Sequence, residues 1–240
     1  PYKVVDIKQE ASQQWTVSVE PDGFEAISFD PGQYAFVSFG ETPFNDRPHP
    51  FSFSSCPSDR PKVSFTIKEL GDFTKTIGEL SIGSNVFIYG PYGHLSRNKP
   101  RGPENKGHGL VLLAAGVGFT PMMSMLREMR AKGEQDPVKV YYACRNEEDI
   151  LYRQELAEIS DELNMELHIV LSQPSENWQG EKGRLDQAYL KEKIAFEHYD
   201  EYLYFICGTT PFINEAAKGL EEVGGIPVFN VIFEDFSTYS

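Results

Sequence analysis

Short apolar and aromatic runs alternate with turn residues over the first hundred positions. We expect strands at Tyr2–Ile7, Trp15–Val19, Gln33–Phe39, Phe51–Ser55, Val63–Glu69 and Asn85–Tyr89. Turn residues such as Asp30-Pro31-Gly32 separate these runs about every ten residues, which is typical of an antiparallel barrel or sandwich. Only Phe73–Leu80 has a helical pattern here. The first part is therefore predicted to be an antiparallel β domain with one helix.

The pattern changes after a polar segment rich in proline and glycine, residues 96–107, which is the best linker candidate. Beyond it we expect strands at Leu110–Ala115, Lys139–Cys144, Glu166–Leu171, Tyr202–Cys207 and Val228–Phe233, and helices at Thr120–Lys132, Leu151–Leu163, Asp186–Ile194 and Phe212–Val223. Such alternation predicts a doubly wound α/β domain with a parallel sheet. We place the boundary after residue 104, so the predicted domains are 1–104 and 105–240.

Composition and charge exclude several classes of protein. The 240 residues are 40% hydrophobic and 24% charged, as in an ordinary folded protein. A net charge of −14 repels phosphate backbones and anionic lipid, so we expect no nucleic-acid partner. The longest run without charged or strongly polar residues, Gly109–Phe119, is far shorter than the ~20 residues needed to cross a bilayer. Because the chain starts at Pro1 rather than Met, we expect it to be cut from something longer, which could include a membrane segment.

Cysteine and histidine positions give no sign of a metal site. Cys56, Cys144 and Cys207 are far apart in the sequence, odd in number and without a CxxC pair, and the five histidines are equally scattered. This pattern argues against a zinc site, an iron–sulfur loop and a disulfide framework. It favours a reducing compartment, so we expect a cytoplasmic location, with the cytoplasmic side of a membrane as an alternative.

The sharpest chemical signal is a GxGxxP turn where a buried strand precedes a helix. Gly116 and Gly118 let the backbone approach a pyrophosphate, the amides at the helix start point toward it, and Pro121 fits the first helical turn. The alternative is an ordinary tight strand–helix turn. Because the α/β alternation surrounds this turn, nucleotide binding is the better interpretation.

Two further segments are candidates for chemistry. Cys207-Gly208 ends a later apolar strand, and ligands collect at the carboxyl ends of strands in doubly wound sheets, so this turn and the Gly116 turn should face one crevice. Alternatively, Cys207 is a small buried hydrophobe. The segment Arg47–Ser55 combines a cation, an aromatic ring and hydroxyls that suit a planar ring with a phosphate, but from spacing alone an ordinary strand is the better interpretation.

Six motifs in one order resemble the ferredoxin–NADP reductase superfamily, and within it the dehydrogenase part of the ferric reductase and NADPH oxidase group. They are His49-Pro50-Phe51-Ser52, Thr66-Ile67-Lys68 with Gly71-Asp72-Phe73-Thr74, Gly90-Pro91-Tyr92-Gly93, Gly116–Pro121 including Thr120, Cys207-Gly208 and Glu234-Asp235-Phe236. The resemblance covers essentially the whole chain. It implies a six-stranded antiparallel FAD-binding barrel followed by an NAD(P)H-binding α/β domain.

The resemblance also implies roles for these residues. Phe51 would stack on the flavin, Ser52 would bind near its N5 atom, and Thr66, Ile67 and Lys68 would run beside the ribose and adenine. The turn with Gly71, Phe73 and Thr74 would cradle the FAD diphosphate at a helix start. Many relatives have Arg at position 49, so the phosphate contact is open between His49 and Arg47. The candidate catalytic residues are Ser52, Cys207, Glu234 and Phe236.

Phe236 would cover the flavin face that nicotinamide must occupy. Tyr239 is a competitor for this role, and the alternative is that Phe236 only packs the strand end against the barrel. The family's Cys-Gly motif usually continues with Pro, whereas Thr209 and Thr210 intervene here. No cysteine cluster for an attached iron–sulfur domain is present in the sequence.

The implied activity is hydride transfer from NAD(P)H to FAD, followed by release of single electrons. The implied acceptor is a haem in a transmembrane segment, leading to ferric iron or dioxygen. Two rivals stay open: a soluble reductase of the same fold that serves a ferredoxin, free flavin or ferric chelate, and an FAD-binding electron-transfer or sensor subunit without turnover of its own.

The coenzyme choice depends on the segment after the second strand of the α/β domain. Arg145 and Arg153 could meet a 2′-phosphate, but Glu147, Glu148 and Asp149 crowd the same loop and would repel it. An acidic side chain instead suits a ribose diol. We therefore favour NADH over NADPH.

Overall fold

The computed structural model describes residues 1–40, 47–71, 74–96, 108–194, 201–224, 226 and 230–234, and every structural statement below concerns these residues. Its first half is a six-stranded antiparallel sheet with the order β4-β3-β6-β1-β2-β5. The strands are β1 (Tyr2–Ala11), β2 (Gln14–Pro21), β3 (Tyr34–Phe39), β4 (His49–Ser52), β5 (Val63–Lys68) and β6 (Asn85–Tyr92). This confirms the antiparallel β domain.

The sheet closes toward a barrel directly after β4. Phe53 forms a bridge with Phe65 of the edge strand β5, and the Ser54 amide donates to the Ser64 carbonyl at 2.8 Å. Inward residues such as Val17, Val37 and Phe65 are fully buried in one core. The short segment after β4 therefore joins the two edges of the sheet and lies beside the barrel core.

The predicted helix over Phe73–Leu80 is wrong in the part that the structure describes. Only two one-turn 3₁₀ helices, η1 (Pro57–Asp59) and η2 (Ile77–Glu79), occur among the described residues of this half. The Thr74 hydroxyl accepts hydrogen bonds from the amides of Leu70 and Gly71, so the chain turns before it can enter a regular helix.

The second half is a parallel sheet with the order β10-β9-β8-β7-β11-β12. Its strands are β7 (Gly109–Ala115), β8 (Val138–Cys144), β9 (Met165–Leu171), β10 (Glu181–Lys182), β11 (Tyr202–Cys207) and β12 (Val231–Glu234). The chain builds outward from β7 to β9 and then returns to the other side of β7 with β11. This reversal at β7 confirms the doubly wound topology.

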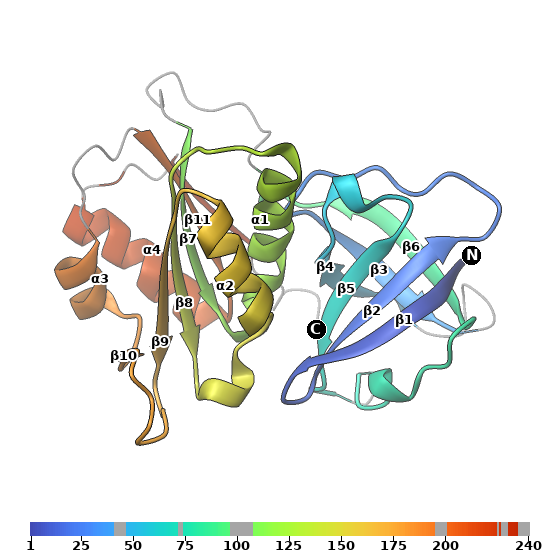
Figure 1. Ribbon diagram of the computed structural model, residues 1–240, viewed down its shortest axis with the longest axis horizontal. Helices are drawn as coiled ribbons and strands as arrows, with labels where there is room; N and C mark the ends of the chain where they lie inside the picture. Colours follow the sequence, from blue (N-terminus) through green and yellow to red (C-terminus); the bar gives the residue numbers. More distant parts are fainter. Residues whose placement is uncertain are drawn as a thin grey trace.

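Helices cover both faces of this sheet. They are η3 (Gly116–Phe119), α1 (Thr120–Lys132), η4 (Glu147–Asp149), α2 (Arg153–Glu162), α3 (Gln187–Lys193) and α4 (Thr210–Gly224). Helices α1 and α2 pack in one core with the sheet, and α3 and α4 in another, on the opposite face (Figure 1). Helix α1 lies between the parallel sheet and the barrel (Figure 1), so it is one of the elements that join the two halves.

Most predicted elements lie within a few residues of the observed ones, and the exceptions have local causes. Helix α2 begins at Arg153 rather than Leu151, because Tyr152 has a left-handed backbone with φ of 54°. The two-residue strand β10 was not predicted, since it is too short to show a pattern. The predicted boundary at residue 104 and most of the predicted linker lie outside the described residues.

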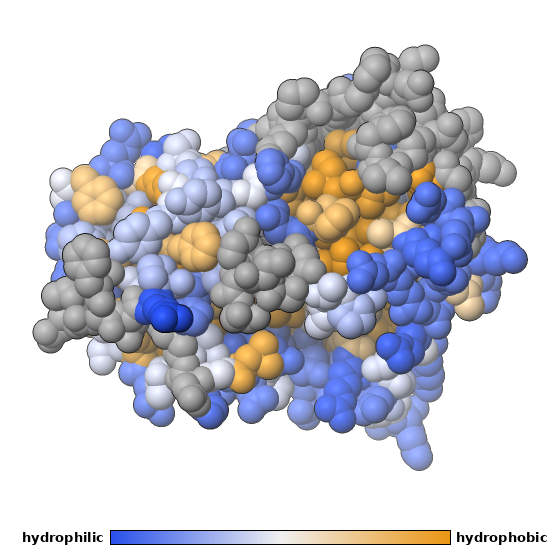
Figure 2. Space-filling view, turned by 180° about the vertical axis from the view of Figure 1, so that it is seen from behind, coloured by the Kyte–Doolittle hydropathy of each residue, from blue (hydrophilic) through white to orange (hydrophobic). Residues whose placement is uncertain are grey.

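The surface seen from behind is largely hydrophilic, and the widest apolar area on this face lies on the half formed by the parallel sheet (Figure 2). Large exposed hydrophobic residues on the barrel include Phe24, Leu70, Ile82 and Tyr92. Within the described ranges, no helix is both long enough and apolar enough to span a membrane.

Candidate active site

A cleft of about 1090 Å³ is bordered by both halves of the molecule. Strands β4 and β5 contribute the barrel wall, and the carboxyl ends of β7, β8, β9 and β11 contribute the opposite wall. This is where ligands bind in doubly wound sheets. The predicted residues that border the cleft are His49, Pro50, Phe51, Ser52, Thr66, Ile67, Lys68, Thr74, Gly116, Gly118, Thr120, Pro121, Arg145, Cys207 and Gly208.

Five predicted residues remain, and the structure describes three of them. Arg47, Gly71 and Glu234 belong to the described chain but lie elsewhere. Phe73 and Phe236, with the competitor Tyr239, lie outside the described residues. The roles given to Phe73 and Phe236 therefore stay predictions from the resemblance.

Strand β4 presents its motif residues to the cleft through its pairing with β3. Phe51 is opposite Ala35, and Ser52 is opposite Tyr34. Phe51 is half-buried and packs against the barrel core, so its ring is held in place at the cleft wall. Of the two phosphate candidates, His49 borders the cleft, whereas Arg47 is exposed and does not.

Strand β5 contributes Thr66, a buried hydroxyl that is held from two sides. Its Oγ1 atom lies 2.7 Å from the Thr16 Oγ1 atom and accepts a hydrogen bond from the Tyr152 hydroxyl. Tyr152 belongs to the other half of the chain, so this bond crosses between the domains. Ile67, the next residue, belongs to the barrel core although it also borders the cleft.

The turn around Thr74 differs from the predicted diphosphate cradle. The Thr74 hydroxyl accepts hydrogen bonds from the amides of Leu70 and Gly71 at 2.9 and 3.1 Å. No helix begins here within the described residues, so the expected helix-start amides are absent from that part of the chain. Thr74 reaches the cleft but Gly71 does not.

The two glycines of the GxGxxP turn serve different purposes. Gly116 has φ of +53° and nothing within 4 Å of an added Cβ, so it faces open space beside the cleft. A Cβ on Gly118 would lie 2.5 Å from the Cys207 carbonyl oxygen. The sequence interpretation gave both glycines to a pyrophosphate, but Gly118 is required by the approach of the Cys207-Gly208 backbone. The two turns thus lie against each other at one crevice.

Helix α1 starts at this crevice and gives it a positive character. Pro121 occupies the first turn, and the Thr120 hydroxyl donates to the Val117 carbonyl at 2.7 Å. The N-terminus of a helix of 13 residues favours anions. The charged residues that border the cleft are Lys68, Arg145, Arg184, Asp149 and Glu215. In a chain of net charge −14, this slight excess of basic residues makes the cleft locally suited to phosphates.

The cysteines of the site are buried thiols. Cys207 is fully buried at the end of β11, and Cys144 borders the cleft at the end of β8. Burial raises the pKa of Cys144 to about 12, so it stays protonated at neutral pH and is a poor nucleophile. The described residues contain no group of three or more His, Cys, Asp or Glu placed to hold a metal ion.

Glu234 has a structural partner that the sequence did not reveal. It ends β12 opposite Cys207 of β11, but its carboxylate accepts hydrogen bonds from the backbone amides of His94 and Leu95, at 3.1 and 3.4 Å. These amides follow β6 of the barrel. The geometry therefore makes Glu234 a link between the two halves, rather than one of the residues that border the cleft.

Several residues at the cleft were missed by sequence reasoning. Ser12 and Gln13 of the β1–β2 turn and Gln14, the first residue of β2, border it, and the Ser12 amide donates to the Glu148 carbonyl at 2.9 Å. Ser172, Gln173 and Arg184 also border it. Ser172 and Gln173 directly follow β9, so the carboxyl-end rule that selected Cys207 would have found them. The hairpin turn carries no comparable signal.

Two family models match the chain. One, described as an FAD-binding domain, matches residues 12–96, and the other, described as an oxidoreductase NAD-binding domain, matches residues 112–218. The models fall on the two halves seen in the structure. Together they make FAD and a nicotinamide dinucleotide the expected ligands of this cleft.

Curated relatives and solved structures agree with these matches. The chain is 28% identical over 231 residues to the reductase component of propane 2-monooxygenase from Mycolicibacterium goodii, covering 92% of this chain and 62% of the relative. It is 32% identical over 166 residues to cytochrome b5 reductase 4 of Mus musculus, covering 67% and 31%. The chain thus spans less than two thirds of either relative.

One solved structure matches along almost its whole length. The flavohem-like FAD/NAD-binding domain of nitric oxide dioxygenase from Vibrio cholerae O1 biovar El Tor superposes with a TM-score of 0.81 at 20% identity. The match covers 98% of this chain and 97% of that one. At this identity the match establishes the shared two-domain fold.

Proposed function

Because this chain belongs to the ferredoxin–NADP reductase superfamily, we propose that it is an NAD(P)H-dependent FAD oxidoreductase that passes single electrons to a protein acceptor. The observation that carries the proposal is that the flavin-motif strand β4 and the GxGxxP turn before α1 border the same cleft. A donor bound at one wall and an acceptor bound at the other would meet there.

The described residues fit the two nucleotides. Gly116 leaves open space at the start of α1, where an added Cβ would touch nothing, and the amides of the helix start suit a diphosphate. On the barrel wall, the half-buried ring of Phe51 suits a planar ring, and the hydroxyl of Ser52 lies next to it in the sequence. Lys68 and His49 offer basic side chains on the same wall.

When bound, FAD supplies the ability to accept a hydride and to release its electrons one at a time. The chain's own contribution is positioning. Phe51 and Ser52 would orient the ring system, and the Gly116–Pro121 turn would hold the dinucleotide phosphates. Cys207, fully buried beside the turn, would give the nicotinamide end an apolar, water-poor wall.

For the coenzyme we propose NADH. Glu147 is turned to the Ser175 amide and hydroxyl, so the acidic side chain of this loop that borders the cleft is Asp149. Arg145 also borders the cleft, where its Nε atom donates to the Gln173 amide oxygen at 2.9 Å. A carboxylate near the adenosine ribose disfavours a 2′-phosphate and suits a free diol.

The acceptor that we propose is a haem protein or an oxygenase component. The names of the relatives support this, since one is a reductase component of a monooxygenase and another a cytochrome b5 reductase. The narrower version, a haem in a transmembrane segment of the ferric reductase or NADPH oxidase type with ferric iron or dioxygen as final acceptor, is supported by the motif resemblance alone. We therefore place it second.

The experiment is an acceptor panel with the purified, FAD-loaded chain. NADH oxidation is measured with ferricyanide, cytochrome c, ferric citrate, free flavin and dioxygen alone. We expect fast turnover with the one-electron acceptors and slow turnover with dioxygen alone. If the protein binds FAD but does not oxidise NADH in the presence of any acceptor of the panel, the result would contradict the proposal and support the sensor alternative.

A further inference from the structure

Helix α1 is bonded to the segment that continues the flavin-motif strand. Arg127 Nη1 donates to the Ser54 carbonyl at 2.5 Å, and Ser124 Oγ donates to the Ser55 carbonyl at 2.7 Å. Both carbonyls lie within three residues of Ser52, the last residue of β4. Arg127 and Ser124 follow the GxGxxP turn within two turns of the same helix. A short, rigid path therefore connects the two walls of the cleft.

The guanidinium of Arg127 is held in one orientation by partners on three sides. It forms two bonds with the Glu155 carboxylate of α2, at 2.8 and 2.6 Å, and lies 4.9 Å from the centre of the Tyr152 ring. Its third partner is the Ser54 carbonyl in the barrel. An arginine side chain fixed in this way has little freedom to reorient. It therefore holds α1, α2 and the barrel segment at Ser54 in a defined relative position, in addition to neutralising the charge of Glu155.

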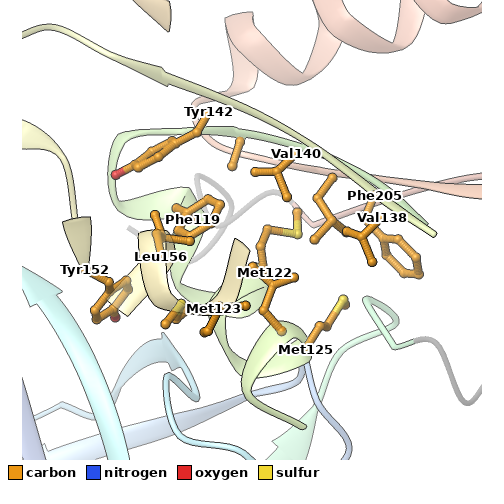
Figure 3. Packing of buried hydrophobic residues seen from close by; sticks show 14 of the residues in the cluster. Phe119, Met122, Met123, Met125, Val138, Val140, Tyr142, Tyr152, Leu156 and Phe205 are labelled. Atoms are coloured by element: carbon orange, nitrogen blue, oxygen red, sulfur yellow. The ribbon is translucent and has the colours of Figure 1, made fainter. Parts of the chain in front are cut away.

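Tyr152 makes a second bond across the same interface. Its side chain is buried at the edge of the α1–α2 core cluster, beside the barrel strands (Figure 3). Its hydroxyl donates to Thr66 Oγ1 on β5, a residue that borders the cleft. A left-handed φ of 54° at Tyr152, which is unfavourable for a residue with a side chain, places the ring under Arg127 and the hydroxyl at Thr66.

We propose that Arg127 and Tyr152 are positioning residues that set where the dinucleotide turn lies relative to the flavin strand. The inference rests on the proposed function, since it assigns these residues an effect on the hydride-transfer step. Neither residue is among those that border the cleft, so we assign to them an effect on position rather than a contact with a nucleotide. A misplacement of the reacting groups by about 1 Å can cost roughly 10²-fold in rate, so a loosened interface slows transfer without weakening binding.

The same helix offers a matched control. Arg130, one turn after Arg127, forms the same two-bond pair with Glu162 of α2, at 2.7 and 2.6 Å. This pair is more exposed than the Arg127 pair, and in the described part of the chain the hydrogen bonds of Arg130 run to α2 and not to the barrel. Arg127→Gln and Arg130→Gln therefore each remove a two-bond link between α1 and α2, but only the first also removes a link between the domains.

The experiment compares the FAD-loaded parent with Arg127→Gln, Arg127→Lys, Tyr152→Phe and Arg130→Gln. Rapid mixing with NADH without oxygen gives the limiting rate of flavin bleaching, the apparent Kd for NADH and the isotope effect with C4-deuterated NADH. FAD content and Tm are measured in parallel. Because the limiting rate describes only loaded protein, partial loss of FAD does not change it.

We expect Arg127→Gln and Tyr152→Phe to lower the limiting rate by about tenfold or more, with the NADH Kd little changed and an isotope effect at least as large as the parent's. Arg127→Lys should recover part of the rate, and Arg130→Gln should stay within about twofold of the parent. Limiting rates of Arg127→Gln and Tyr152→Phe equal to that of Arg130→Gln would overturn the inference. If Arg127→Gln fails to fold, Tyr152→Phe, which keeps the ring, decides alone. If NADH does not bleach the flavin of the FAD-loaded parent protein, the result would instead contradict the proposed function, and this inference with it.

Discussion

The carboxylate of Glu234 accepts a hydrogen bond of 3.1 Å from the backbone amide of His94, 140 residues earlier in the chain. One residue ends the last described strand of the parallel sheet, and the other follows the last strand of the barrel. This bond adds to the Arg127 and Tyr152 contacts that also link the two nucleotide domains. The relative position of the domains is thus built from a few long-range polar contacts.

Replacing Glu234 separates this structural role from the catalytic role that the resemblance implies. Glu234→Ala removes the acceptor of two amides, and we expect a loss of about 1–3 kcal/mol in the free energy of unfolding, measured with urea. Glu234→Gln keeps an oxygen acceptor and should lose less. Unchanged stability in Glu234→Ala, combined with a slower flavin reduction in both variants, would support the catalytic role instead.

Gly118 should tolerate no side chain. In Gly118→Ala the new methyl group would lie 2.5 Å from the Cys207 carbonyl oxygen, which is backbone and cannot rotate away. We expect a loss of about 1–3 kcal/mol in unfolding free energy. Gly71→Ala is the control for stability, because its Cβ would meet nothing within 4 Å and should change the unfolding free energy by less than about 0.5 kcal/mol. Equal stability of the two variants would show that the turns can move apart.

Coenzyme preference should depend on Asp149. We expect the parent to favour NADH in kcat/KM, and Asp149→Asn to raise kcat/KM for NADPH by a few-fold, equivalent to about 1 kcal/mol for a partly exposed charge. Glu148→Gln is the control, since Glu148 lies in the same loop but not among the residues that border the cleft. A parent that prefers NADPH tenfold or more would reverse the assignment and point to Arg145 as the phosphate partner.

Glu128 should make the domain interface sensitive to acid. Burial alone would raise its pKa, but hydrogen bonds from Lys132 and from the Ser58 amide outweigh burial, so the pKa lies below its ordinary value of 4.5. A carboxylate with a lowered folded pKa stabilises above the unfolded pKa, and the contribution is lost as the pH falls through the folded pKa. Glu128→Gln should therefore be less stable than the parent at pH 7, and the difference should shrink at a pH below 4.5. A difference that stays constant with pH would contradict this.

The sequence pattern predicted those helices and strands whose type and ends depend on neighbouring residues in the sequence. Strand β11 was predicted with both ends correct because a continuous apolar run, buried on both faces, has no competing interpretation. The helix over Phe73–Leu80 was wrong because its described part forms a turn, in which the Thr74 hydroxyl binds the Leu70 and Gly71 amides, followed by a single 3₁₀ turn at Ile77–Glu79. The start of α2 was misplaced because the backbone of Tyr152 is fixed by contacts with Thr66 and Arg127, which no local pattern contains.

In the candidate site, too, the residues marked by a local sequence pattern were predicted, and those placed by long-range contacts were not. The GxGxxP turn and the Cys207-Gly208 turn were found because strand ends and glycine spacing are visible in the sequence. The Arg127–Ser54 and Glu234–His94 contacts join residues 73 and 140 positions apart. Nothing in the periodicity of either segment marks such a partner, so residues that set domain position could be found only from the folded chain.

The most direct test of the account is an anaerobic titration of the purified, FAD-loaded chain with NADH, followed through the visible absorbance of the flavin. The account predicts a yellow protein whose colour is bleached fully by one equivalent of NADH per bound FAD, because both nucleotides occupy the one cleft. A yellow protein that excess NADH and NADPH both leave unbleached, or a chain that takes up no FAD, would contradict it.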